Sequence, residues 1–350
     1  MALRLSSKPL RDTKADMALF VDREHEVERI RRALLGELNV LLLGESGSGR
    51  TTLLKHVAYR LRTEWNEPHV FIEGGVAKDA RTFLSLLRFR LLGDQHVSAG
   101  EALARSAHSA ASLLSGEPSL SIAVPRHETE ELLSLYSDVS LAAERKPGCV
   151  VLVDETASVE LTHTIFGRFR DETWELPLRW VVAGDASARA TYLAPPADAF
   201  FEVVAEIGSL DERAALAMLK RRIDDEPLPE TQLQALIALS DGNPRHLLAR
   251  ARRLLIDGAD IESLTATREW QSARLAELGP AAGRLLEDLE TYGPASASDP
   301  DLLERLGWSR GRAAQVFRQL EHSKLVRGSS RRSLTGGPDR KVFEPLITAQ

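Results

Sequence analysis

The stretch from Leu38 to Leu54, LNVLLLGESGSGRTTLL, constrains this chain more than any other part of its sequence. An apolar run gives way at Gly44 to a short polar loop, and apolar residues then return at helical spacing, so we expect a strand, a loop and a helix in succession. The loop follows the pattern G-x-x-x-x-G-[K/R]-[S/T] as far as Thr51. Gly44, Gly47 and Gly49 free the backbone for positive φ and for close approach, so that N–H groups can surround a phosphate at the start of the helix. The sequence therefore predicts a phosphate-binding P-loop.

We expect the whole loop and the first helical turn to hold ATP or ADP, through Gly44, Glu45, Ser46, Gly47, Ser48, Gly49, Arg50, Thr51 and Thr52. Arg50 stands where the motif usually has lysine, and it exchanges a compact ammonium for a longer planar guanidinium. Because the motif's cation must sit at one point between the β- and γ-phosphates during hydrolysis, nucleotide binding should tolerate arginine better than hydrolysis does. Thr51 is the expected magnesium ligand. An accidental glycine-rich turn is the alternative, against which the flanking strand and helix argue.

The segment from Cys149 to Glu155, CVVLVDE, has the continuous apolar character of a central parallel strand and ends in two carboxylates. Asp154 is expected to hold Mg²⁺ through water, and Glu155 to orient or deprotonate the attacking water. A strand that ends in acids is common, but about 100 residues beyond a P-loop the pattern is specific. Cys149 itself is expected to be a buried strand residue.

Composition excludes several classes of protein. The net charge of −6 argues against a surface that coats nucleic acid or membrane as a whole, although a local basic patch remains compatible with it. The single cysteine excludes an intramolecular disulfide and a cysteine-rich zinc site. No apolar segment approaches the roughly 18 to 20 residues of a membrane span, and the N-terminus lacks a signal-peptide core. We therefore expect a cytoplasmic protein with no membrane partner, and the abundant Ala, Arg and Leu suggest a bacterial source.

The residues just before the P-loop strand read FVDREHEVERIRRALLG from Phe20 onward. An apolar stripe is expected along one face of a helix here, at Val27, Ile30, Leu34 and Leu35. The segment resembles the opening motif F-x-G-R-E-x-E of AAA+ ATPases of the origin-recognition and cell-division-control type, and of the related STAND ATPases, with Asp22 in the place of glycine. The resemblance implies an α/β fold in which a P-loop AAA+ core with a parallel sheet is followed by a helical lid and a C-terminal winged-helix domain. A plain amphipathic helix would explain the same residues.

The resemblance also implies roles for three further positions. Asp185, after the strand expected at 179–183, lies where the family places a polar sensor of the γ-phosphate, usually Asn or Thr; an acid there could hold water but would repel phosphate. The sequence DGNPR at 241–245 suits a capped helix start, and in the resembled ATPases the matching arginine, Arg245, reaches the γ-phosphate as sensor 2. Arg168 or Arg170 could act in trans on a neighbouring subunit's nucleotide, with a solvated surface role as the alternative. Catalysis would then rest on Glu155, Arg50 and Arg245.

We divide the chain into a flexible segment at 1–18, the AAA+ core at 19–207, the lid with a connecting helix at 208–278, and the winged helix at 279–350. Within the core we expect a strand at 69–72 and a helix at 80–92 with Arg81, Arg88 and Arg90 in solvent. Residues 94–127 are treated as an insertion or mobile loop, and a helix is expected at 128–145. A further helix is expected at 157–170, and a last strand from Phe200.

The C-terminal segment has three expected short helices followed by a hairpin with its turn at 336–339, which is the order of a winged helix. From Asp301 to Gln350 there are ten Lys or Arg residues against five Asp or Glu, so this part is basic within an acidic chain. This inversion favours binding to double-stranded DNA. The candidates for the groove are Arg310, Arg312, Gln315 and Arg318, and those for the phosphates are Arg331, Arg332, Arg340 and Lys341. A winged helix used only for protein contacts is the alternative.

These patterns predict an ATP-binding protein whose nucleotide, with Mg²⁺, sets the position of a DNA-binding winged helix, and whose hydrolysis is slow or impaired because of Arg50. A homo-oligomer or a partner protein is compatible with the resemblance. The second interpretation is a non-hydrolysing pseudo-ATPase that serves as a scaffold or regulatory subunit and binds a partner protein through the winged helix. A third, a transcription regulator that senses a ligand through residues 94–127, has little support.

Overall fold

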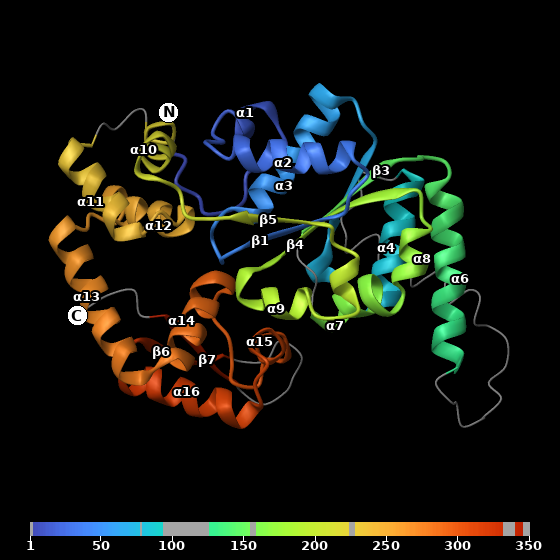
Figure 1. The fold of residues 1–350 in the computed structure, drawn as a ribbon. Coiled ribbons are helices and arrows are strands. Elements are labelled where there is room, and N and C mark those ends of the chain that lie inside the picture. The colour runs from blue at the N-terminus through green and yellow to red at the C-terminus, as the bar shows by residue number, and fades with distance from the viewer. Residues whose placement is uncertain are drawn as a thin grey trace. The chain divides into compact units, whose positions relative to one another are not determined.

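The computed structural model describes residues 3–77, 79–93, 126–154, 159–223, 228–331 and 340–345. The chain forms two compact units, one of residues 8–210 and the other of residues 211–350 together with the first seven residues. Each is described by itself, and Figure 1 shows both. In the described ranges, no helix combines the length and the apolar character that a membrane span requires.

The first unit is built on a five-stranded parallel sheet with the strand order β2-β3-β4-β1-β5. Its strands are β1 (Val40–Gly44), β2 (His69–Glu73), β3 (Cys149–Asp154), β4 (Leu178–Asp185) and β5 (Val203–Ile207). Because the strands are parallel, their carboxyl-terminal ends all lie at the same end of the sheet. The register places Gly44 opposite Asp185 and Glu73 opposite Asp154. The loop that follows β1 and the acids that end β3 and β4 therefore lie together at the carboxyl-terminal end of the sheet.

Helices cover both faces of the sheet (Figure 1). The described α-helices of this unit are α1 (Lys14–Met17), α2 (Glu24–Leu35), α3 (Arg50–Arg60), α4 (Ala80–Leu92), α6 (Arg126–Ala143), α7 (Val159–His163), α8 (Arg170–Trp174) and α9 (Arg189–Tyr192). A π-helical turn follows α3 at Leu61–Trp65, and another follows α7 at Thr164–Arg168. Alternate strand residues feed two separate apolar clusters, with Val40 and Leu42 on the α2 and α3 side and Leu41 and Leu43 on the other. The buried strands thus read as continuous apolar runs because both faces are covered.

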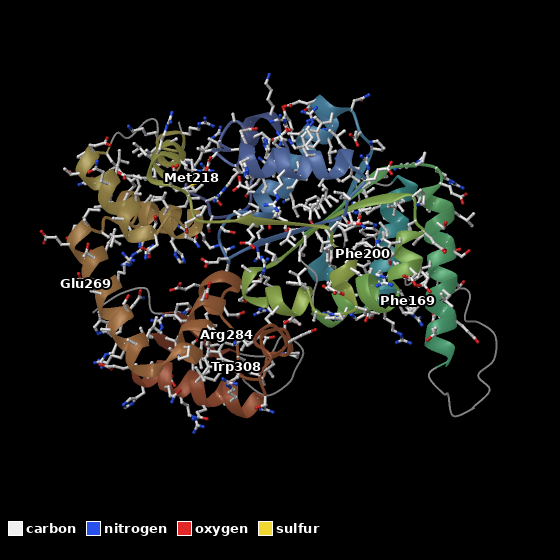
Figure 2. All side chains as sticks on the ribbon, viewed as in Figure 1. Phe169, Phe200, Met218, Glu269, Arg284 and Trp308 are labelled. Carbon is white, nitrogen blue, oxygen red and sulfur yellow. The ribbon has the colours of Figure 1, made fainter. Side chains whose placement is uncertain are left out.

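Aromatic rings fill the second cluster. The ring of Phe166 lies 5.4 Å from that of Trp180 and 4.8 Å from that of Phe200, centroid to centroid. Figure 2 shows Phe169 and Phe200 among the side chains beneath the sheet. Phe200 and Phe201 are buried in this cluster, so the last strand begins at Val203 and not at Phe200 as expected.

The sequence-based helix predictions need four corrections. Leu35 is 65% exposed, because the buried stripe of α2 runs through Ala33 and ends at Leu34. The helix expected at 157–170 is broken into α7, a π-helical turn and α8. The helix expected at 128–145 spans 126–143. Arg90 is half-buried and lines a pocket, whereas Arg81 and Arg88 are exposed as expected. The expected insertion lies outside the described residues, except for its last two positions, which begin α6.

The second unit begins with four helices, α10 (Glu212–Lys220), α11 (Glu230–Ser240), α12 (Pro244–Leu255) and α13 (Ile261–Leu278). Three of them start at side-chain caps that the sequence supplies. The carboxylate of Asp211 accepts a hydrogen bond from the Ala214 N–H at 2.7 Å, and Asp260 caps α13 in the same way. Asn243 accepts from the Arg245 N–H at 3.0 Å, with Pro244 in the first turn. These caps satisfy backbone donors that a helix start otherwise leaves unpaired.

The chain then forms α14 (Pro280–Tyr292), α15 (Pro300–Leu306), α16 (Arg310–His322), β6 (Val326–Arg331) and β7 (Arg340–Pro345). The two strands pair antiparallel, and Ala295 bridges to Phe343 beside them. These elements share one apolar core, in which the rings of Phe317 and Phe343 stack 4.3 Å apart. Figure 2 marks Trp308, which also belongs to this core. The order of elements is the one expected for a winged helix, and the turn at 336–339 lies outside the described residues.

Candidate nucleotide-binding site

The loop between β1 and α3 has the backbone that a phosphate cradle needs. Gly47 and Gly49 have φ angles of 78° and 101°, in the region that glycine adopts without strain. Gly44 is needed for a different reason, because its neighbours leave no room for a side chain. A Cβ at this position would lie 2.6 Å from Ser48 Oγ and 3.2 Å from Ile207 Cβ. No side chain caps α3, whose N-cap is Gly49. The backbone donors of its first turn can therefore face an anion.

The remaining loop residues support this shape. The Ser48 N–H donates to the Glu45 carbonyl at 3.1 Å, which closes the tip of the loop around Ser46. Ser48 Oγ is buried and has no hydrogen-bond partner among the described residues. Thr52 lies half-buried on the first turn of α3. The structure thus gathers all nine predicted loop residues at the carboxyl end of β1.

Thr51 and Asp154 meet although 103 residues separate them in the sequence. The Thr51 hydroxyl donates to Asp154 Oδ1 at 2.9 Å. One oxygen comes from the start of α3 and the other from the end of β3, and both residues are half-buried. Hydroxyl and carboxylate oxygens are the ligands that Mg²⁺ prefers in proteins. Glu155, the predicted water-activating residue, lies outside the described residues.

Arg50 and Asp185 form an ion pair beside the loop. Arg50 Nη2 lies 3.3 Å from Asp185 Oδ2, and the two side chains are 10% and 30% exposed. Asp185 also accepts the Ser187 N–H at 2.9 Å, which fixes the carboxylate at the end of β4. Because β4 is the neighbour of β1, Asp185 lies next to the loop that carries Arg50. The acid at the expected sensor position is thus a counterion for the atypical arginine.

Arg23 is a residue of this region that the sequence analysis did not single out. It is 7% exposed, and its Nη2 donates to the Gly208 carbonyl at 2.6 Å while Nη1 pairs with Glu26 at 3.2 Å. Asp22 and Arg23 both have positive φ, at 63° and 74°. A left-handed backbone explains why Asp22 occupies a position that is glycine in the resembled families, because aspartate tolerates this region better than most residues. The F-x-G-R-E motif was the signal that could have identified Arg23.

Three further residues with predicted roles belong to other elements of the chain. Arg245 is half-buried at the start of α12, in the second unit, so its action as a sensor stays a prediction. Arg168, the candidate for action in trans, donates to Thr129 Oγ1 at 3.2 Å. Arg170 pairs with Asp171 at 3.0 Å.

Four of the predicted DNA contacts, Arg310, Arg312, Gln315 and Arg318, are exposed on α16. The Arg312 guanidinium lies 4.9 Å from the centroid of the Trp308 ring, so this side chain also packs within the unit. Lys341 on β7 pairs with Glu321 at 2.7 Å. The backbones of Arg331 and Arg340 lie opposite each other at the ends of β6 and β7, and Arg332 lies outside the described residues.

Comparison with known protein families gives a match. The family model of the AAA ATPase domain matches residues 19–190, which include the loop, Asp154 and Asp185. Residues 19–190 form an AAA ATPase domain. The resemblance to AAA+ proteins that the motifs indicated is thereby confirmed, and so is the α/β core with its parallel sheet.

Comparison with solved structures gave matches that cover most of the chain. The Orc1 protein of Aeropyrum pernix, determined in complex with DNA, is 16% identical, with 94% of this chain and 90% of that chain covered at a TM-score of 0.50. Cdc6p of Pyrobaculum aerophilum is 14% identical, with 93% of each chain covered at a TM-score of 0.45. At 16% identity the likeness to Orc1 concerns the fold alone. A search of curated proteins found none with significant similarity to this chain.

Proposed function

We propose that this chain is an ATP-binding AAA+ protein of the origin-recognition type in which ATP or ADP, bound with Mg²⁺, controls a DNA-binding winged helix. The observation that carries the proposal is the hydrogen bond between Thr51 and Asp154 beside a glycine-rich helix start. The glycine-rich loop, which can hold phosphate, and the oxygen ligands of Thr51 and Asp154 then lie together at the carboxyl-terminal end of one parallel sheet.

The residues of the site fit a magnesium nucleotide. The backbone N–H groups of the loop and of the first turn of α3 would hold the phosphates, and Gly44 keeps the space next to Ser48 and Ile207 free of a side chain. Thr51 and Asp154 would hold Mg²⁺, directly or through water. The bound ion neutralises phosphate charge and polarises the terminal phosphate. Glu155 would act on the attacking water, and Arg245 would sense the γ-phosphate.

Arg50 is the reason we propose slow or impaired hydrolysis. Its side chain is long and planar, and its guanidinium is paired with Asp185. The same ion pair favours a second candidate function, a nucleotide-holding pseudo-ATPase that serves as a scaffold or regulatory subunit and binds a partner protein through the winged helix. In both cases the nucleotide acts as a switch, because it favours one arrangement of the two units over another.

A steady-state ATPase assay with Mg²⁺, with and without duplex DNA, tests the proposal on the wild type, Glu155→Gln and Arg50→Lys. Turnover that disappears in Glu155→Gln supports a working ATPase. If only Arg50→Lys turns over, the scaffold function is the better one. Thermal denaturation with and without ATP provides the binding control, and we expect Arg50→Ala to abolish the melting shift. An unchanged shift in that variant would count against the loop as the nucleotide site.

The DNA-binding part of the proposal rests on the second unit. Three helices and a hairpin follow in winged-helix order, and α16 presents Arg310, Gln315 and Arg318 to solvent. We also propose that the AAA+ core spans 19–207, the lid with its connecting helix 208–278 and the winged helix 279–350. The proposal further includes a cytoplasmic location and assembly with further copies of the chain or with a partner protein. Gel-shift titration of duplex DNA with ATP, with ADP and without nucleotide tests the coupling.

A further inference from the structure

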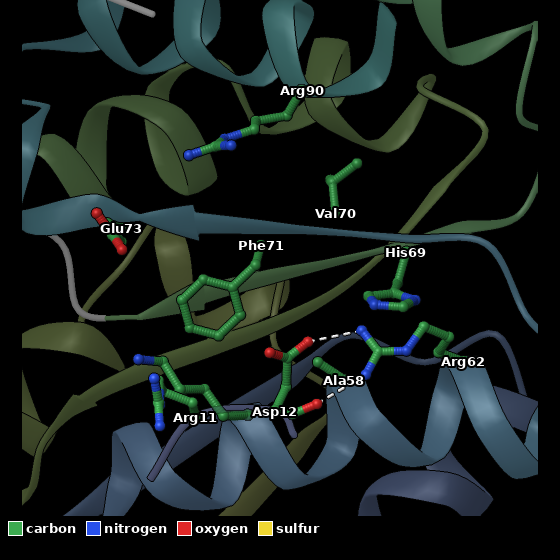
Figure 3. A pocket seen from close by; sticks show the side chains of 10 residues that line it. Arg11, Asp12, Ala58, Arg62, His69, Val70, Phe71, Glu73 and Arg90 are labelled. Atoms are coloured by element: carbon green, nitrogen blue, oxygen red, sulfur yellow. Dashed lines mark hydrogen bonds and ion pairs between the residues drawn. The ribbon is translucent and has the colours of Figure 1, made fainter. Parts of the chain in front are cut away.

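A pocket of about 290 Å³ lies beside the edge strand β2, on the first unit, and none of its lining residues belongs to the nucleotide loop at 44–52 (Figure 3). The lining side chains come from the N-terminal segment, from α3 and the turn after it, from β2, and from α4. The volume is close to the lower end of the range for small-molecule sites, which begins at about 300 Å³. The pocket therefore has room for one small molecule or for one residue of a polymer.

Positive charge dominates the pocket wall. Four cationic side chains line it, Arg11, Lys55, Arg62 and Arg90, against the two carboxylates of Asp12 and Glu73. Arg62 is largely neutralised, because its Nη1 and Nη2 donate to the carboxylate and to the carbonyl of Asp12, both at 2.7 Å. Arg11 pairs through Nε with Asp16 Oδ2 at 3.0 Å, but its side chain is 76% exposed, so its terminal nitrogens can still face a ligand. Lys55 and these nitrogens of Arg11 are therefore the groups that can hold an anion here. A site of this kind in an acidic protein attracts a small anion.

Two rings lie on the same side of β2. His69 and Phe71 are two residues apart, so their side chains project from one face of the strand, and Figure 3 shows both rings directed toward Asp12 and Arg62. Both residues are half-buried. Lys55 Nζ lies 5.9 Å from the centroid of the Phe71 ring, and Figure 3 shows Arg11 on the same side of the strand. An aromatic surface bordered by cations is the arrangement that proteins use to stack a base and hold its phosphate.

We propose that this pocket binds one nucleotide unit, with its base stacked on Phe71 and its phosphate held by Lys55 and Arg11. The unit has two possible sources with the same chemistry: a free nucleoside monophosphate, or one residue of a single-stranded nucleic acid that runs along the sheet edge. Burial lowers the pKa of His69, so at neutral pH its ring is an uncharged surface beside Phe71. Arg90, on α4 across the strand, adds to the positive potential.

The test uses the full chain carrying Arg50→Ala, so that the nucleotide loop does not contribute. The probes are 2-aminopurine riboside 5′-monophosphate and a pentanucleotide with one central 2-aminopurine, whose fluorescence falls when the base stacks. We expect saturable quenching by the protein, loss of that quenching in Phe71→Leu, and binding about fivefold or more weaker in Lys55→Gln and Arg11→Gln. Arg88→Gln, an exposed arginine of α4 that does not line the pocket, is the matched control and should bind as the parent does.

The source of the nucleotide follows from the ratio of the two affinities. A pentanucleotide that binds at least about tenfold tighter than the monophosphate, with a steeper salt dependence, identifies a single strand; equal affinities identify a free nucleotide. The proposal is overturned if neither probe is quenched, or if quenching is the same in Phe71→Leu. Thermal denaturation controls for folding, and if Phe71→Leu fails to fold, unchanged binding in both Lys55→Gln and Arg11→Gln overturns the proposal instead.

Discussion

Arg50 Nη2 lies 3.3 Å from Asp185 Oδ2, so the atypical residue of the P-loop is paired with the atypical residue at the end of the neighbouring strand β4. Each departure from the resembled family's pattern is unfavourable by itself. An arginine places its charge farther out than lysine, and an acid beside a phosphate site repels the ligand. Together they form a partly buried ion pair, in which Asp185 competes with a phosphate for Arg50.

Asp185→Asn should tighten nucleotide binding. The substitution removes a negative charge next to the loop and releases Arg50, so we expect ADP affinity to rise by about tenfold, or ~1.4 kcal/mol. Isothermal titration calorimetry with ADP and Mg²⁺ measures the change. Asp171→Asn removes an exposed acid of the same unit that pairs with Arg170, and it should leave the affinity unchanged. Weaker binding in Asp185→Asn would mean that the carboxylate holds Arg50 in the productive position.

Thr51→Val should remove the magnesium dependence of nucleotide binding. Valine keeps the shape of threonine but lacks the hydroxyl that contacts Asp154 at 2.9 Å. We expect the wild type to lose roughly tenfold in ATP affinity when EDTA replaces Mg²⁺, and the variant to bind weakly in both buffers. Thr63→Val, in the π-helical turn after α3, is the control. A variant that still responds to Mg²⁺ as the wild type does would exclude Thr51 as a ligand.

Arg318→Ala on α16 should weaken DNA binding. If Arg318 contacts a phosphate, we expect the loss to be about equal for all DNA sequences and the slope of log affinity against log salt concentration to fall by about 1. If Arg318 contacts a base, the variant should instead lose sequence preference. Fluorescence anisotropy at several salt concentrations distinguishes these outcomes. Arg284→Ala, an exposed arginine of α14, is the control. Arg312→Ala is a poorer choice because Arg312 packs on Trp308, and its loss should also lower stability by about 0.5–1 kcal/mol. Equal DNA affinity of wild type and Arg318→Ala would show that Arg318 does not contact DNA.

The stability of the second unit should fall below pH 6.5 because of His246. Burial, followed by the charges of Arg250 and Arg245, lowers the pKa of His246 to about 4. Between pH 6.5 and 4 the unfolded chain binds a proton that the folded state does not, so the free energy of unfolding rises with pH in this window. From pH 7 to pH 5 we expect a loss of about 2 kcal/mol from this residue alone.

Denaturant titrations at pH 7 and pH 5 measure that loss, and His246→Gln should reduce the difference between the two curves. His25→Gln is the control, because His25 is exposed on α2. His56 and His69 also have pKa values lowered by burial and add to the effect with the same sign, in the first unit. An identical pH difference in His246→Gln and wild type would show that His246 does not carry the linkage.

Much of the AAA ATPase core could be predicted because its signals are local. The strand before the P-loop, the strand that ends at Asp154 and the helix at 80–92 all follow from short-range periodicity, and their bounds in the structure agree closely. The predictions that were wrong concern packing. By spacing alone, Leu35 belongs to the apolar stripe of α2. In the structure it is exposed, because it is the last residue of the helix and its side chain points away from the buried face.

The sequence by itself determined the P-loop, the acids that follow the apolar strand, the capped start of α12 and the basic C-terminal segment, because each depends on residues close together in the chain. Only the tertiary structure decided that Thr51 contacts Asp154, that Asp185 pairs with Arg50 across 135 residues, and that Arg11, Lys55 and Phe71 line one pocket. The physical reason is the strand order. Placing β4 beside β1 and leaving β2 at the edge creates neighbours that no local pattern encodes.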